Sequence, residues 1–160
     1  MIACINIYNS DNLYSIMKIV VISGFFDPLH VGHVEYIELA RKLGDKLIVI
    51  LNNDNQAKLK KVEAFMRLEE RKKILEALKH VDEVFVSIDE DISVVESLRE
   101  LHKQQKVHIF AKGGDRFAHE IPESNICKEL GIEIIDGVGE KIQSSSNFYN
   151  KVKKNLFKKQ

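Results

Sequence analysis

The sequence predicts an α/β protein, a Rossmann-like three-layer sandwich with a five-stranded parallel sheet. Short runs rich in β-branched residues alternate with segments of helical periodicity along most of the chain. Alternating strands and helices imply right-handed crossovers, which place parallel strands in one sheet that helices cover on both faces. The 160 residues suffice for one core and are too few for two ordinary domains.

The first half of the chain contains two helices between three strands. The first helix is expected to turn its apolar residues inward, namely Ile37, Leu39, Ala40 and Leu43, and to stop at Gly44. The second helix has Ile74, Leu75 and Leu78 on one face. In order, we expect a strand at 18–23, a helix at 33–43, a strand at 47–51, a helix at 67–78 and a strand at 83–86.

The second half continues the alternation. The helix that precedes the fifth strand ends at Gly131, a usual helix stop. In order, we expect a helix at 94–103, a strand at 107–111, a helix at 124–130, a strand at 132–135 and a closing helix at 146–156.

The pattern suggests one domain at 17–153, between an N-terminal extension at 1–16 and a basic tail at 154–160. The extension precedes a second methionine, and an extra strand or a docked tail is the alternative. The 24 Lys and Arg balance 24 Asp and Glu, so we expect neither nucleic acid nor a membrane as a partner. The two cysteines lack metal-ligand spacing, and no apolar run reaches membrane length, so we expect a cytoplasmic protein.

The most informative stretch is GFFDPLHVGH, residues 24–33, between the first expected strand and the first expected helix. Gly24 permits a tight exit from the strand, and Gly32 lets the backbone approach a ligand. The unpaired N–H groups and the dipole of that helix end favour an anion. His30 and His33 can both donate to phosphate oxygens near neutral pH. The alternative is two surface histidines beside a glycine turn.

This stretch resembles the signature of the nucleotidyltransferase superfamily with the H-x-G-H motif. That superfamily includes glycerol-3-phosphate cytidylyltransferase, the heptose-phosphate adenylyltransferase domain, archaeal FAD synthase and pantetheine-phosphate adenylyltransferase. The resemblance covers Met17 to about Lys153, because EERKKILEALKHVDEVF, AKGGDR and SSSN follow in the family's order. It implies that His30 and His33 bind the triphosphate and stabilise the pentacoordinate α-phosphate. The other nucleotide-binding residues that it implies in this loop are Gly24, Phe25, Phe26, Asp27 and Gly32.

The same resemblance implies a catalytic lysine after the second strand, where the chain reads NNDNQAKLKKVEAFMR. Counting back from the E-R pair of the next helix favours Lys60, whereas the K-x-x-K pattern of heptose-type enzymes favours Lys58 with Lys61. A solvated basic loop is the alternative for all three. For Asp27, a role in shaping the loop is expected, with helix capping or direct ligand binding left open.

Three further segments extend the expected site. Glu70 and Arg71 are either site residues or an exposed salt-bridged face. The sequence KGGDR after the fourth strand, nearest to the heptose-phosphate type, provides Lys112, Gly113, Gly114, Asp115 and Arg116. The serine run before the last helix matches a stretch that holds the β- and γ-phosphates in the family, although serines there also serve as helix caps. Its members are Ser144, Ser145 and Ser146.

The resemblance implies a nucleotidyltransferase that joins a nucleoside monophosphate from ATP or CTP to a phosphorylated sugar, polyol or cofactor precursor. Pyrophosphate would leave with Mg²⁺ carried mainly by the triphosphate, and we expect a homodimer. Cytidylyltransferases commonly have an arginine before the serine run, and this chain has only Lys141 there, which favours the heptose-type group. The alternatives are a FAD synthase-type adenylyltransferase and a non-catalytic nucleotide-binding module.

Overall fold

A computed structural model describes residues 17–60, 64–114 and 121–139, and every structural statement below concerns these ranges. The expected extension at 1–16, the helix at 146–156 and the basic tail lie outside them. The elements, in chain order, are β1 (Ile19–Gly24), α1 (Val31–Arg41), β2 (Lys46–Leu51), α2 (Asp54–Lys60), α3 (Leu68–Glu76), β3 (Glu83–Val86), α4 (Val95–Gln104), β4 (Ile109–Gly113), α5 (Ser124–Leu130) and β5 (Glu133–Val138).

The five strands form one parallel sheet in the order β3-β2-β1-β4-β5, which confirms the predicted fold class. β1 and β2 pair along their whole length, from Ile19 opposite Lys46 to Gly24 opposite Leu51. The chain builds outward from β1 to β3, then returns to place β4 on the other side of β1. The exits of β1 and β4 therefore lie next to each other where the winding reverses, the usual ligand position in such sheets.

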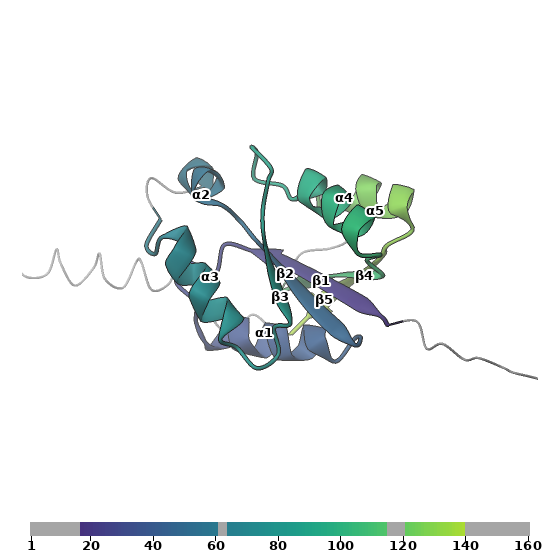
Figure 1. Cartoon of the computed structure of the whole chain (residues 1–160), viewed down its shortest axis with the longest axis horizontal. Helices are drawn as coiled ribbons and strands as arrows, with labels where there is room; N and C mark the ends of the chain where they lie inside the picture. The colour runs from purple at the N-terminus through teal and green to yellow at the C-terminus, as the bar shows by residue number, and fades with distance from the viewer. Residues whose placement is uncertain (1–16, 61–63, 115–120, 140–160) are drawn as a thin grey trace, which may run out of the picture.

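Two hydrophobic clusters lie on opposite faces of the sheet, because successive strand side chains point to opposite sides. Val20 and Ile22 of β1 face α1 and α3, where they pack with residues such as Ile37 and Leu75. Val21 faces α4 and α5. Figure 1 shows the two pairs of helices on either side of the sheet, which gives the three predicted layers.

The element boundaries differ from the predicted ones by a few residues, and one helix was not predicted. The first helix begins at Val31 rather than at residue 33, with His30 as its N-cap. The fifth strand runs to Val138 instead of ending at 135. The segment after β2, expected to be a basic loop, forms α2, in which Asp54 in the first turn and lysines in the last turn complement the helix dipole.

Two apolar side chains expected to point inward are partly exposed. Leu39 is 39 % exposed because the buried stripe of α1 runs through Ile37 and Ala40, and Leu39 is turned away from both. Ile74 is 38 % exposed because it flanks the stripe of α3 that contains Arg71 and Leu75. In both helices, the apolar residue directly before a buried one in the sequence therefore lies at the margin of the buried surface.

Candidate functional site

The two histidines of the H-x-G-H sequence lie together at the start of α1. Their rings stack with centroids 3.7 Å apart and an interplanar angle of 19°. The backbone N–H of His30 donates to Nδ1 of His33 over 3.3 Å, so a neutral His33 ring carries its proton on Nε2. Burial lowers the pKa of His30, which favours its neutral form. The structure therefore brings together the two residues that the sequence singled out.

The loop before these histidines has a constrained backbone. Phe26 has a φ of 49°, a left-handed conformation unusual for a bulky residue, and it is only 2 % exposed. Its ring lies edge-on to His33 with centroids 5.0 Å apart. A side chain at Gly24 would meet the Phe26 ring at 3.0 Å, so glycine gives this loop its space. Gly32 follows in the first turn of α1.

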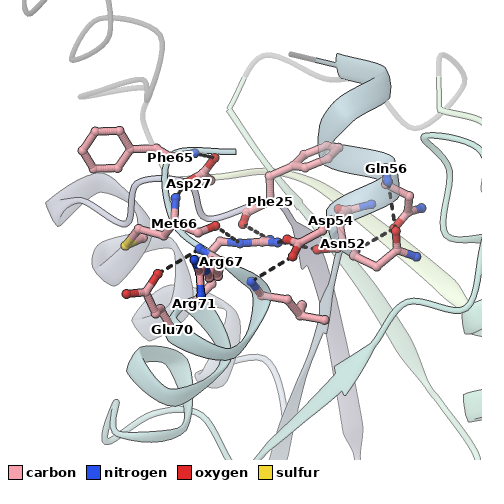
Figure 2. A network of polar contacts seen from close by, with 12 residues as sticks. Phe25, Asp27, Asn52, Asp54, Gln56, Phe65, Met66, Arg67, Glu70 and Arg71 are labelled. Atoms are coloured by element: carbon pink, nitrogen blue, oxygen red, sulfur yellow. Dashed lines mark hydrogen bonds and ion pairs between the residues drawn. The ribbon is translucent and has the colours of Figure 1, made fainter. Parts of the chain in front are cut away.

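Asp27 connects the histidine loop to the segment that leads into α3. Its carboxylate is 2 % exposed and accepts the backbone N–H groups of Phe65 and Met66, each over 2.8 Å (Figure 2). The expected role in shaping the loop fits these contacts. Capping of α1 does not, because His30 occupies the N-cap position of that helix.

Arg71 is a buried hub, which corrects the alternative of an exposed salt-bridged face. Its guanidinium is fully buried and donates to three backbone carbonyls from different segments (Figure 2). Those carbonyls belong to Phe25 at 2.9 Å, Asn52 at 2.8 Å and Met66 at 3.1 Å. A carboxylate oxygen of Asp54 lies 2.5 Å from Nη2. One side chain thus joins the exits of β1 and β2 to the starts of α2 and α3.

Glu70 has a local role. Its carboxylate accepts the backbone N–H of Arg67 over 2.9 Å, which satisfies an N–H group at the start of α3. Sequence reasoning recognised this E-R pair but could not separate a helix cap from a hub, since both residue types also occur on exposed helix faces.

Two of the three lysines after β2, Lys58 and Lys60, lie on the helix α2, where both are exposed. Lys60 Nζ lies 4.6 Å from the centroid of the Phe25 ring, over the loop that leads to the histidines. Lys58 is exposed two residues earlier on the same helix. Lys61 lies outside the described residues. The structure thus brings Lys60 to the histidine loop, and the choice of the catalytic lysine stays a prediction.

The KGGDR segment begins at the end of β4, next to β1. Lys112 is 7 % exposed, and its ammonium lies 3.0 Å from Ser23 Oγ, 3.7 Å from a carboxylate oxygen of Glu123 and 4.5 Å from the Phe110 ring centroid. These three partners lie within the protein, on the face that α4 and α5 cover. Lys112 joins β1 to the segment before α5 through these contacts. That it also contacts the nucleotide stays a prediction.

The two glycines of this segment are required for different structural reasons. A side chain at Gly113 would come within 2.9 Å of the Tyr36 ring, whose hydroxyl donates to the carbonyl of Ala111 over 2.7 Å. Gly114 has a φ of 74°, which favours glycine. Asp115 and Arg116 lie outside the described residues, as do the serines at 144–146.

Comparison with known proteins identifies the family. The family model described as cytidylyltransferase-like matches residues 21–152. The chain belongs to this family. Among curated relatives of this cytidylyltransferase-like protein, the bifunctional protein HldE of Aliarcobacter butzleri is 38 % identical over 141 residues, which are 86 % of this chain and 27 % of the relative. The FAD synthase of Pyrococcus abyssi is 38 % identical over 98 residues, 61 % of this chain and 63 % of the relative.

A second FAD synthase, from Ferroglobus placidus, is 46 % identical over 76 residues, 48 % of this chain and 49 % of the relative. A solved structure supports the fold. The lipopolysaccharide core biosynthesis protein from Thermoplasma volcanium superposes with a TM-score of 0.63 at 23 % identity, over 77 % of this chain and 98 % of that one. The cytidylyltransferase-like chain therefore spans about a quarter of the HldE relative and less than two thirds of both FAD synthases.

No three His, Cys, Asp or Glu side chains within 17–60, 64–114 and 121–139 come together as a metal-binding group. In the same ranges, every helix is too short or too polar to cross a membrane.

Proposed function

We propose that the chain is a nucleotidyltransferase that moves a nucleoside monophosphate from ATP or CTP to a phosphorylated acceptor and releases pyrophosphate. The observation that carries this proposal is the stacked pair of imidazoles of His30 and His33 at the N-terminal end of α1. Both lie at the carboxyl edge of the sheet, where β1 meets its neighbours. Membership of the cytidylyltransferase-like family supports the same reaction class.

In the proposed reaction, a phosphate oxygen of the acceptor forms a bond to the α-phosphorus of the triphosphate. The bond from that phosphorus to the bridging oxygen breaks, and pyrophosphate leaves with the electron pair. The protein forms no covalent intermediate, so it accelerates the step by alignment and by stabilising the charge that develops. The Nε2–H of a neutral His33 is suited to donate to an α-phosphate oxygen, and the lowered pKa of His30 keeps its ring neutral at the same position.

The remaining predicted groups act on the phosphates. Lys60 or Lys58, together with Lys61, would contact the triphosphate or the acceptor's phosphate from α2 and the residues after it. Gly114 with Asp115 and Arg116, and the serines at 144–146, complete the expected nucleotide site. Mg²⁺ would enter with the triphosphate and neutralise charge on the leaving pyrophosphate, and we assign no protein ligand to it.

The favoured acceptor is a sugar or polyol phosphate. KGGDR and the lack of an arginine before the serine run support this choice, because both resemble the heptose-phosphate adenylyltransferase type. The similarity to the bifunctional protein HldE over 86 % of this chain also supports it. A FAD synthase-type reaction is the second candidate, supported by the 46 % identity to the FAD synthase of Ferroglobus placidus over 76 residues.

The test is product formation. The protein is incubated with Mg²⁺, each of ATP and CTP in turn, and pooled sugar phosphates, polyol phosphates and flavin mononucleotide. We expect pyrophosphate release and one new diphosphate-linked product by mass spectrometry, both formed at least ~10² more slowly with His33→Ala. Triphosphate binding in calorimetry without any product from the panel would instead support a nucleotide-binding module.

A further inference from the structure

Polar contacts, more than apolar packing, fix the position of the lysine-bearing helix α2. Within this seven-residue helix, Gln56 and Ala57 are the buried residues, and Ala57 offers one methyl group. Burial of so small an apolar surface contributes little to the orientation of a helix. The hydrogen bonds of its first turn must therefore hold α2 in place.

Gln56 makes the most extensive of these contacts. Its side chain is completely buried, and its Nε2 donates to the carbonyls of Asp91, over 2.6 Å, and Ser93, over 2.8 Å. Its Oε1 accepts the backbone N–H of Asn53 over 3.0 Å. The amide thus bonds at both ends, and it attaches α2 to a segment 35 and 37 residues further along the chain.

That segment is itself well anchored. Ser93 N donates to the carboxylate of Asp91 over 2.8 Å, and Val94 N donates to buried Glu123 over 3.0 Å. Asn53 adds a parallel attachment, since its Nδ2 donates to the carbonyls of Ser87 and Asp89 over 3.0 and 3.1 Å. The start of α2 is therefore fixed to the connection between β3 and α4.

The other end of α2 faces the histidine loop. Lys60 is four residues beyond Gln56, about 6 Å along the helix axis, and its ammonium lies over the Phe25 ring. A change at the Gln56 anchor would pivot or shift the helix, and its lysines would move with it. Because charge-assisted contacts to phosphate depend on geometry, a displacement of this kind weakens them.

We propose that Gln56 is a positioning residue of the phosphate site, which acts by holding α2 so that Lys60 faces the histidine loop. This inference rests on the proposed function, because it requires that a lysine of α2 contact phosphate. Gln56 is neutral and buried, so neither its charge nor its exposure would indicate this role.

The test compares two glutamines at opposite edges of the sheet. Gln56→Met and Gln105→Met each replace an amide by an apolar chain of similar volume. Gln105 bonds Glu83 over 2.9 and 3.1 Å and accepts from Lys46 over 2.6 Å, far from α2 at the amino ends of β2 and β3. Binding of inorganic pyrophosphate with Mg²⁺ is measured by calorimetry on the full chain, and Tm is measured for each variant. Pyrophosphate is used because its binding is independent of the base and the acceptor.

We expect Gln56→Met to bind pyrophosphate at least about tenfold more weakly, which corresponds to the loss of one charge-assisted contact. Gln105→Met should lower Tm without changing pyrophosphate affinity. In a Lys58→Ala, Lys60→Ala background, Gln56→Met should cause no additional loss of affinity, because it acts through those lysines. If Gln56→Met does not fold, Gln56→Asn, which withdraws the amide by one carbon, takes its place with the same expectations.

Unchanged pyrophosphate affinity in the folded Gln56 variant would overturn the inference and leave the proposed function intact. An equal loss of affinity in the wild-type and Lys58→Ala, Lys60→Ala backgrounds would overturn it too, since Gln56 would then affect binding without these two lysines. If the wild-type protein binds neither pyrophosphate nor any triphosphate, the phosphate site itself fails, and the proposed function fails with it.

Discussion

Charged networks lie at both ends of the strands, but one bonds mainly to backbone groups and the other to side chains. At the carboxyl edge, the side chains of Asp27 and Arg71 bond mainly to backbone groups of distant segments. At the amino edge, Lys46 bonds to the side chains of Glu83 and Gln105, each over 2.6 Å. The first network fixes the course of the loops around the histidines, whereas the second joins side chains to one another.

Their exposure differs in the same sense. The Arg71 side chain is completely buried, whereas the Lys46 and Glu83 side chains are 22 and 33 % exposed. Water and salt screen the amino-edge pair, so its removal costs little. Water and salt do not screen a buried cation in this way, so its contacts with the protein contribute more to stability. Residues that position the site therefore also contribute to the stability of the fold, and the substitutions below test how far the two roles separate.

The largest expected effect is that of Arg71→Met. It leaves the carbonyls of Phe25, Asn52 and Met66 without this donor and removes the partner of Asp54. Asp54 is 41 % exposed and keeps contact with water, so the cost comes mainly from the three carbonyls. A buried acceptor that loses its donor costs about 1–3 kcal/mol, so the three together cost at least about 3 kcal/mol, which lowers Tm by roughly 6–12 °C or more for a chain of this size. Calorimetry measures the change. Lys46→Met is the matched control, and an equal Tm loss in both variants would remove the distinction between the edges.

The next effect is on turnover. His30→Ala and His33→Ala should each lower kcat by at least ~10², as loss of a preorganised oxyanion donor does elsewhere, with a much smaller change in triphosphate affinity. Tm should change little, because neither ring belongs to the hydrophobic clusters. Steady-state kinetics with the identified acceptor measure kcat and KM. Full turnover in both variants would show that these histidines are surface residues beside a glycine turn.

Asp27→Asn should have an intermediate effect. The carboxylate accepts two N–H groups with separate oxygens, and an amide would direct its NH₂ group at one of them. A buried donor left without its partner costs about 1–3 kcal/mol. We expect kcat to fall by more than this loss of stability explains, because the segment that leads into α3 is then detached from the histidine loop. Asp82→Asn removes a carboxylate that accepts the backbone N–H of Leu47 at the amino end of β2, and it controls for general destabilisation. Equal kcat losses would contradict a positioning role for Asp27.

The fold could be predicted from the sequence because each strand and helix has its own local pattern. The run LIVIL is apolar on both faces, as buried parallel strands are, and Gly131 stops its helix in a left-handed conformation with a φ of 67°. Helix α2 could not be predicted in this way. It is short and mostly polar, and its position depends on hydrogen bonds to residues more than thirty positions away.

The candidate site could be predicted where a residue type and its spacing both limit the chemistry, as for His30 and His33. The roles of Arg71 and Gln56 could not, since both residue types usually occur at the surface and only the tertiary structure buries them. The contacts of Lys112 could not be predicted from its charge. A lysine beside two glycines suggests a ligand contact, which stays a prediction, and the structure adds that its ammonium lies near Ser23 Oγ and a carboxylate oxygen of Glu123.

The smallest effect concerns pH and separates the two edges by their titration ranges. Burial lowers the pKa of His30 below its ordinary 6.5, so the folded protein binds fewer protons than the unfolded chain, and stability falls as pH drops below about 6.5. For Glu83, burial raises the pKa but the hydrogen bonds from Gln105 and Lys46 outweigh it, so the net pKa lies below 4.5 and this contribution is lost only in more acidic solution. Measured as Tm against pH, His30→Gln should flatten the profile just below about pH 6.5, whereas Glu83→Gln should flatten it below about pH 4.5. Identical profiles for His30→Gln and the wild-type protein would show that protonation of this imidazole does not depend on folding.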